Sequence, residues 1–169
     1  MYKLTLLNFL ILFTFGCNKT TEEVKDWSYE LDGNNKIQTT TSLITDNEIV
    51  RCFYFPSGHL KAIARYKNNK INGEQYYFFP NGKLKRKENF RDGIQWGKAY
   101  YYYESGVIQY ERNWEDGIKV GYCQDYYDIS GRIQAINLYN DAGQLFYKKT
   151  FDSEGHLLAE EGSKPVIND

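Results

Sequence analysis

Phe53-Tyr54-Phe55-Pro56-Ser57-Gly58-His59-Leu60 is the stretch of sequence that decides the fold, because it recurs along the chain. Two further copies read Tyr77-Phe78-Phe79-Pro80-Asn81-Gly82-Lys83-Leu84 and Tyr101-Tyr102-Tyr103-Glu104-Ser105-Gly106-Val107-Ile108. Their glycines are 24 residues apart (82 − 58 and 106 − 82), and more glycines follow after steps of 25, 12 and 12, at Gly131, Gly143 and Gly155. A fixed period of this size is typical of a repeat array, in which each unit buries its surface against its neighbours.

The residues around each glycine predict two strands and two turns per repeat. An apolar residue follows the glycine by two positions and an aromatic one by eight in most copies, and this even spacing places both on one face of a strand. A turn follows at Asn68-Asn69, Asp92-Gly93 and Asp116-Gly117, where Asn and Gly tolerate positive φ. We therefore expect an all-β fold, a single-layer twisted antiparallel meander of about ten strands over residues 27–158, with structural turns at Gly58, Gly82, Gly106, Gly131, Gly143 and Gly155.

The recurring motifs resemble a known family. The aromatic-x-x-Gly-x-Leu turn, followed by Phe90-Arg91-Asp92-Gly93 or Trp114-Glu115-Asp116-Gly117 and then another glycine, is similar to MORN repeats of the bacterial variant type. The 12-residue units with Tyr127-Asp128 and Phe151-Asp152 resemble the YD repeats of Rhs-type proteins. This resemblance implies a β-hairpin scaffold, and it implies an antitoxin-like role, because such bacterial proteins are often labelled antitoxins.

The N-terminus has the layout of an export signal. Lys3 precedes a 12-residue, mostly apolar run, Leu4 to Phe15, which is shorter than the roughly 20 residues that span a bilayer. Gly16-Cys17 resembles a bacterial lipoprotein cleavage site, although Thr14 stands where leucine is usual. We expect a signal peptide at 1–16, lipidation of Cys17, a polar tether at 17–26 and a location on the membrane of a bacterial cell envelope. The alternative is an ordinary signal peptide with an incidental cysteine.

Two further cysteines, Cys52 and Cys123, are three repeats apart. At about 4.8 Å per strand they should lie on the order of 25 to 30 Å from each other, whereas bridged Cα atoms lie within about 7 Å. We predict two unpaired thiols. Residues 159–169 have no periodic pattern and are predicted to form a flexible tail.

The strand alternation predicts two unlike faces. One carries most of the apolar residues and is expected to form the dry side. The other places aromatic rings among lysines, glutamines and glutamates, a mixture that protein interfaces favour. We assign partner binding to the rings of this second face, with cross-strand packing as the alternative role. They are Tyr54, Tyr76, Phe78, Tyr100, Tyr102 and Tyr127.

Composition and motifs argue against several other classes of function. The net charge of −1 offers no basic surface for nucleic acid. His59 and His156 each follow a turn glycine in distant repeats, so we interpret them as exposed spacers rather than as a catalytic or metal-binding pair. The acidic residues beside glycine are explained by turn chemistry. We therefore predict a protein that is not an enzyme and needs no cofactor or metal.

Three functions stay open at this point. The first is a membrane-anchored binding module for a protein partner, such as the toxin that the family resemblance implies. The second is a carbohydrate- or peptidoglycan-binding envelope lipoprotein, because exposed tyrosine rings can stack on sugars. The third is an enzyme acting on cell-wall material. The identity of the partner, the side of the membrane and the oligomeric state are not encoded in any motif.

Overall fold

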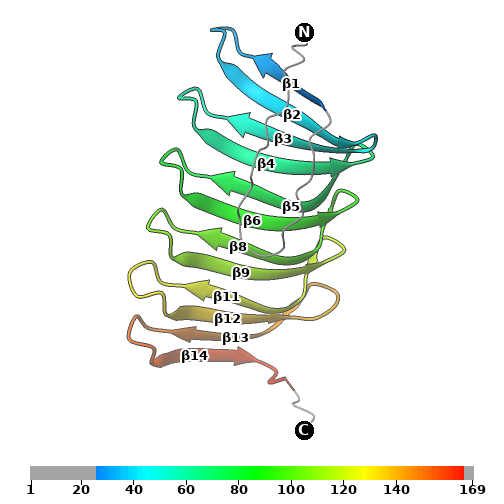
Figure 1. Cartoon of the computed structure of the whole chain (residues 1–169). Coiled ribbons are helices and arrows are strands. Elements are labelled where there is room, and N and C mark those ends of the chain that lie inside the picture. Colours follow the sequence, from blue (N-terminus) through cyan, green and yellow to red (C-terminus); the bar gives the residue numbers. More distant parts are fainter. Residues whose placement is uncertain (1–25, 166–169) are drawn as a thin grey trace.

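The protein is an open, all-β meander (Figure 1). The structure, a computed structural model, describes residues 26–165. These residues form one antiparallel sheet of 14 strands and no helix. Twelve strands follow one another as spatial neighbours in chain order, and the two-residue strands β7 and β10 extend β6 and β9. The sheet does not close on itself, so β1 and β14 are its two edges.

The strands are short and regularly spaced, as the repeat requires. In chain order they are β1 (Asp26–Leu31), β2 (Ile37–Thr45), β3 (Glu48–Tyr54), β4 (Leu60–Lys67), β5 (Lys70–Phe78), β6 (Leu84–Arg91), β7 (Ile94–Gln95), β8 (Gly97–Tyr102), β9 (Ile108–Glu115), β10 (Ile118–Lys119), β11 (Gly121–Tyr126), β12 (Ile133–Tyr139), β13 (Leu145–Phe151) and β14 (Leu157–Gly162).

The predicted meander is confirmed, and the difference in strand number has a local cause. Twelve long strands, β1 to β14 without β7 and β10, stand where about ten were expected over residues 27–158. Gly97 and Gly121 adopt positive φ and divide two further segments, which creates β7 and β10. The additional hairpin β1–β2 turns at Asn35, which adopts positive φ as the turn glycines do. At the other end β14 reaches Gly162, so the sheet includes residues 159–162, which we had placed in the tail.

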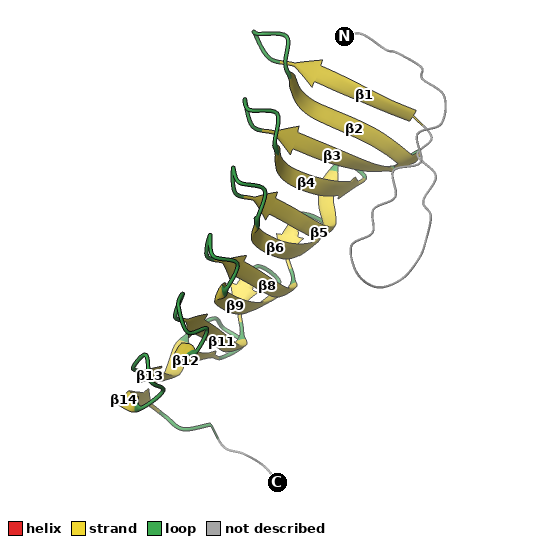
Figure 2. Cartoon of the chain, turned by 60° about the vertical axis from the view of Figure 1, so that its left-hand side comes forward, coloured by secondary structure: helices red, strands yellow, loops and turns green. Residues whose placement is uncertain are grey.

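The sheet is a single layer whose two faces differ (Figure 2). We call one the packed face, because it carries nine of the eleven buried residues in the described part of the chain: Thr39, Ala62, Ala64, Gln75, Glu88, Ala99, Cys123, Ala135 and Asn137. Small side chains there lie between larger ones such as Tyr77 and Tyr101, which shield them from solvent. Leu138 and Tyr147 are the buried residues of the opposite face. The packed face thus provides the dry side that strand alternation predicts.

Turns on the glycine side of the sheet are connected by hydrogen bonds. In four of the six described turns on this side, the residue after the turn glycine, or after Asn35 in the first turn, bonds to a carbonyl of the next turn. Lys36 Nζ donates to Pro56 O at 3.0 Å and Lys83 Nζ to Glu104 O at 2.8 Å. His59 Nδ1 lies 2.8 Å from Pro80 O, and Arg132 Nη1 donates to Glu154 O. We call this series the turn ladder. His59 is exposed, as we expected, and its ring also joins two neighbouring repeats.

Cysteines and the N-terminal segment complete the comparison with the sequence. Cys52 and Cys123 are both free, as predicted, and Cys123 is fully buried. Burial raises the pKa of the Cys52 thiol, and a hydrogen bond with Thr40 opposes this only in part. The predicted signal peptide, the lipidation site Cys17 and the tether up to residue 25 lie outside the described residues.

Candidate functional site

The face opposite the packed face is the candidate site, and its central rings lie in one line across the sheet. Tyr76 pairs with Lys87, Lys87 with Tyr100, Tyr100 with Glu111, and Glu111 with Gln124. Neighbouring residues in this line belong to successive strands, so their side chains project to the same side. Aromatic rings therefore alternate with charged side chains along β5, β6, β8 and β9. We call this surface the tyrosine face.

A second line of rings runs along the glycine-side ends of the strands. Tyr54, Phe78 and Tyr102 each lie two residues beyond the central line and so share its face. The hydroxyl of Tyr54 is 3.4 Å from Thr40 Oγ1, on the neighbouring strand. Burial raises the pKa of Tyr102, and the adjacent Tyr100 adds to the effect. The structure thus brings together five of the six residues that we assigned to partner binding.

The sixth residue, Tyr127, has a different neighbour. It lies one position past β11, and its hydroxyl donates to Phe151 O at 2.8 Å, which connects two turns. Tyr126 takes the place in the second line instead, 24 residues after Tyr102. Its hydroxyl donates to Glu111 Oε2 at 3.0 Å and to Gln124 Oε1 at 2.9 Å. We missed Tyr126 because the turn before Gly131 holds one extra residue. The ring four positions before this glycine is therefore Tyr127, which is not on the second line.

Electrostatic contacts fix the ring of Tyr76. Its hydroxyl donates to the carboxylate of Glu74, which also forms an ion pair with Lys87. The ammonium of Lys87 lies 5.5 Å from the centre of the same ring, within reach of a cation–π interaction. Burial opposes charge on Glu74, but hydrogen bonds from Lys87 and Tyr76 outweigh it and lower the pKa of the carboxyl. This triad holds the ring of Tyr76 in one orientation.

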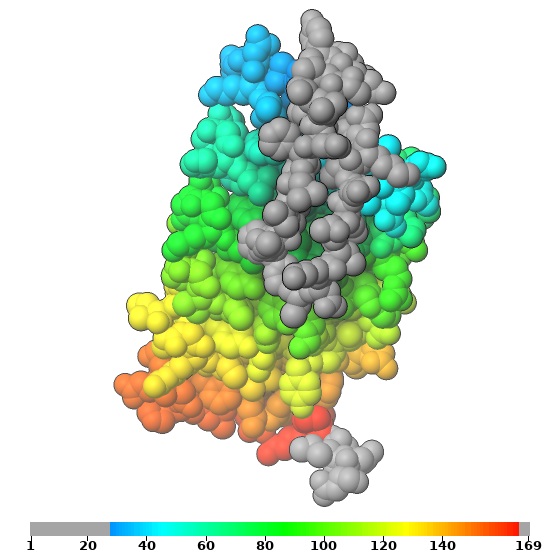
Figure 3. All heavy atoms as spheres, in the orientation of Figure 1, coloured from blue at the N-terminus to red at the C-terminus, as the bar shows by residue number. Residues whose placement is uncertain are grey.

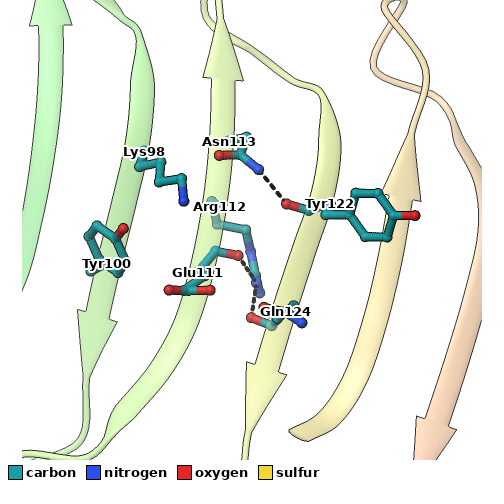
Figure 4. A pocket seen from close by; sticks show the side chains of 7 residues that line it. All are labelled: Lys98, Tyr100, Glu111, Arg112, Asn113, Tyr122 and Gln124. Carbon is teal, nitrogen blue, oxygen red and sulfur yellow. Dashed lines mark hydrogen bonds between the residues drawn. The ribbon is translucent and has the colours of Figure 1, made fainter.

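A shallow hollow of about 100 Å³ lies on the tyrosine face between β8, β9 and β11 (Figure 4). Tyr100 stands on one side, and Glu111, Asn113 and Gln124 follow across the hollow. On the far side the ring of Tyr122 points away from these side chains. Tyr122 is 57% exposed. Asn113 Nδ2 donates to Tyr122 O, and Arg112 donates to the carbonyls of Glu111 and Gln124, so these side chains brace the backbone under the hollow.

Polar groups at the rim of the hollow are available to a ligand. Among residues 26–165 the ammonium of Lys98 has no ion-pair or hydrogen-bond partner. Glu111 uses one carboxylate oxygen for Tyr126, and Gln124 uses its carbonyl for the same hydroxyl. The hollow therefore offers a cation, a carboxylate and an amide beside the ring of Tyr100.

Clusters that could hold a metal ion are absent from the described part of the chain. His156 Nδ1 lies 3.0 Å from Asp152 Oδ2 within its own turn, and His59 belongs to the turn ladder several repeats away. Between Asp26 and Pro165 there is also no helix with the length and hydropathy needed to cross a membrane.

The family model named MORN repeat variant matches residues 48–68, 71–92 and 97–116. Each matched segment covers one hairpin, β3–β4, β5–β6 or β8–β9, and together these hairpins carry most of the tyrosine face. Residues 48–116 are a run of MORN repeat variants. A search of curated proteins found no match to this chain. The MORN repeats thus account for the scaffold of the site, while β11 to β14 continue the same meander beyond them.

Proposed function

We propose that the protein is a non-catalytic binding module whose tyrosine face captures a protein partner. The observation that carries this proposal is the line of alternating rings and charges from Tyr76 to Gln124, on a sheet over which residues 26–165 form no second layer. Tyrosine rings supply contact area at low entropic cost, and interface centres are enriched in them. The triad of Tyr76, Glu74 and Lys87 reduces the ordering that binding requires.

We also propose where this module is located and what kind of partner it binds. Lipidation at Cys17 would hold the sheet at a bacterial membrane through the polar tether. The resemblance to antitoxin-labelled MORN variants and to YD repeats suggests a toxin as the partner, with the sheet as the neutralising surface. A polypeptide toxin with basic and apolar residues would complement Glu111 and the rings around it.

A triple substitution tests the tyrosine face. Tyr76→Ser, Tyr100→Ser and Tyr102→Ser together remove three neighbouring rings, and we expect loss of partner capture in pull-downs from cell-envelope extracts. Ile94→Ser with Ile118→Ser is the matched control, because these exposed side chains lie in the opposite row of turns, 49% and 42% exposed. Capture of the same polypeptide by the folded triple variant would contradict the proposal.

A second candidate function, glycan binding, is favoured by the hollow between Tyr100 and Tyr122. The ring of Tyr100 could stack on a sugar, and the amide and carboxylate groups beside it could hydrogen-bond the sugar. Retention on insoluble peptidoglycan, lost on Tyr100→Ser with no polypeptide captured, would favour the glycan over the protein partner.

A further inference from the structure

The last strand has an unpaired edge. β14 pairs with β13 on one side, and no described strand lies on the other (Figure 1). All six of its residues are exposed, with Leu157 at 51% and Leu158 at 65%. An exposed edge with leucine side chains on both faces is a template for another strand.

The hydrogen-bond pattern shows which backbone groups are available. Ser163 N donates to Phe146 O at 3.0 Å, so Ser163 and Phe146 form a hydrogen-bonded pair. Bonding alternates along an antiparallel ladder, so Glu161 and Ala159 also bond to β13. The amides and carbonyls of Leu158 and Glu160 therefore point outward, toward an added strand.

The turn ladder is also incomplete at this end. Lys36, His59, Lys83 and Arg132 each follow a turn position and bond to the next turn. His156 follows Gly155 and has the equivalent position, but no described turn lies beyond it. Its ring bends back to Asp152 instead. A further turn placed there would continue the series.

One register rule holds for four of the five strands that follow a glycine-side turn and have a strand after them; the exception is β9, whose Tyr110 pairs with Asp125, six positions before Gly131. The residue four positions after the turn residue pairs with the residue five positions before the next one: Thr39 with Phe53, Ala62 with Tyr77, Arg86 with Tyr101 and Ala135 with Thr150. Counted from Gly155 and from Asn35, the rule pairs Ala159 with Glu30. The adjacent pairs, such as Ala64 with Gln75, likewise extend to Glu161 with Ser28.

We propose that β14 of one molecule pairs with β1 of a second copy of this chain, so that the meander continues from molecule to molecule. The continuous path has twelve strands, an even number, so β1 of a copy in the same orientation runs antiparallel to β14. The rule places no like charges opposite each other, since Glu161 meets Ser28 and Glu30 meets Ala159. Pairing of two β14 strands would instead gather Glu160 and Glu161 of both copies in one short ribbon. Because the contact joins two different surfaces, it produces open-ended chains rather than closed dimers.

Sedimentation velocity of the full-length chain in mild detergent tests the assembly. We expect a concentration-dependent series of species larger than dimers. Leu158→Pro removes an outward amide without taking a bond from β13, and we expect monomers from this variant alone. Mixed with the unaltered chain it should shorten the series, because its own β1 can still cap a growing β14 edge. Monomers at all concentrations, or a discrete dimer that ignores added Leu158→Pro protein, would overturn the proposal.

A charge reversal tests the register itself and does not depend on proline. Ala159→Glu places a second carboxylate opposite Glu30 of the neighbouring copy, and we expect association to weaken about fivefold. Adding Glu30→Lys in the same chain should restore it, while circular dichroism confirms that each variant is folded. Failure of the double variant to recover would refute the β14–β1 register.

Discussion

Gly82 shows what the repeat demands of a single residue. Its φ is +84°, and the other five turn glycines of the series are also positive, between +63° and +101°. A side chain in this region costs roughly 1 to 2 kcal/mol. The surroundings differ, however: a Cβ on Gly82 would meet nothing within 4 Å, whereas a Cβ on Gly143 would overlap Ile118 Cγ2.

We therefore predict that Gly82→Ala lowers the free energy of unfolding by roughly 1 to 2 kcal/mol and that Gly143→Ala lowers it further. Gly82→Val should exceed Gly82→Ala, because a branched Cβ resists positive φ. Urea unfolding measures each value. Ile118→Ala added to Gly143→Ala should recover the excess, and equal losses at Gly82 and Gly143 would show that the overlap is irrelevant.

Two tyrosine hydroxyls make the free energy of unfolding depend on pH in the alkaline range. Burial, followed by a hydrogen bond of 2.7 Å to Glu88, raises the pKa of Tyr101 to about 12. Burial and Glu111 do the same for Tyr126, again to about 12. In the unfolded chain these phenols ionise near pH 10. Their contribution is therefore complete below about pH 10 and is lost as pH rises toward 12.

We expect the urea midpoint to be steady at neutral pH and to fall between about pH 10 and 12. Tyr101→Phe should make this fall shallower, because the variant has one fewer group whose pKa is raised on folding. Tyr122→Phe is a suitable control on an exposed ring. An unchanged slope in Tyr101→Phe would mean that this hydroxyl does not couple to folding.

At the scale of the elements, neighbouring hairpins are joined by hydrogen bonds between turns at both ends of their strands. The turn ladder joins successive turns at the glycine side. At the opposite ends of the strands, Gly93 N donates to Ile71 O and Gly117 N to Gln95 O. Register and turn bonds together leave each hairpin in contact with its two neighbours only. Stability then behaves as a sum of hairpin and neighbour terms.

Substitution of Lys83 measures how much one step of the turn ladder contributes to the free energy of unfolding. Its ammonium donates to Glu104 O at 2.8 Å and to Ser105 O at 3.2 Å. We expect Lys83→Met to lower the free energy of unfolding by about 0.5 to 1.5 kcal/mol, since the apolar stem is kept and the bonds are lost. Lys98→Met, at a cation without a partner among the described residues, should be near neutral. Equal effects of the two would mean that the ladder bond is not stabilising.

Over the whole molecule, protection should decrease from the centre to the ends. Figure 3 shows the strands as successive bands of colour down the molecule, and each end strand has a single neighbour. The buried residues Gln75, Glu88 and Ala99 belong to β5, β6 and β8, whereas β14 buries none.

Hydrogen exchange at low protein concentration tests this gradient. Amides of β5 to β9 should exchange slowest and those of β14 fastest, with Leu158 and Glu160 ahead of Ala159 and Glu161. A uniform exchange rate from β5 to β14 would contradict the nearest-neighbour picture. Slower exchange at Leu158 and Glu160 as concentration rises would be the mark of assembly through this edge.

Much of this molecule follows from local sequence. Turn glycines at a fixed interval and even-numbered apolar spacing specify the hairpins, because backbone sterics at a tight turn and the two-residue alternation of a strand act over a few residues. The same two-residue alternation predicted that Tyr76 and Tyr100 lie on one face of the sheet. Tyr126 was missed where one extra residue in a turn shifted the count.

Contacts between repeats had to come from the tertiary structure. Residues 20 to 24 positions apart meet only when sheet twist and strand register are fixed, which is why the turn ladder at His59, the hollow between Tyr100 and Tyr122 and the bond from Tyr127 to Phe151 O were not foreseen. The sequence alone determined an open ribbon of hairpins, because each turn is a local event. Which side chains touch across neighbouring hairpins, and which edges are left unpaired, depended on the packing of the whole sheet.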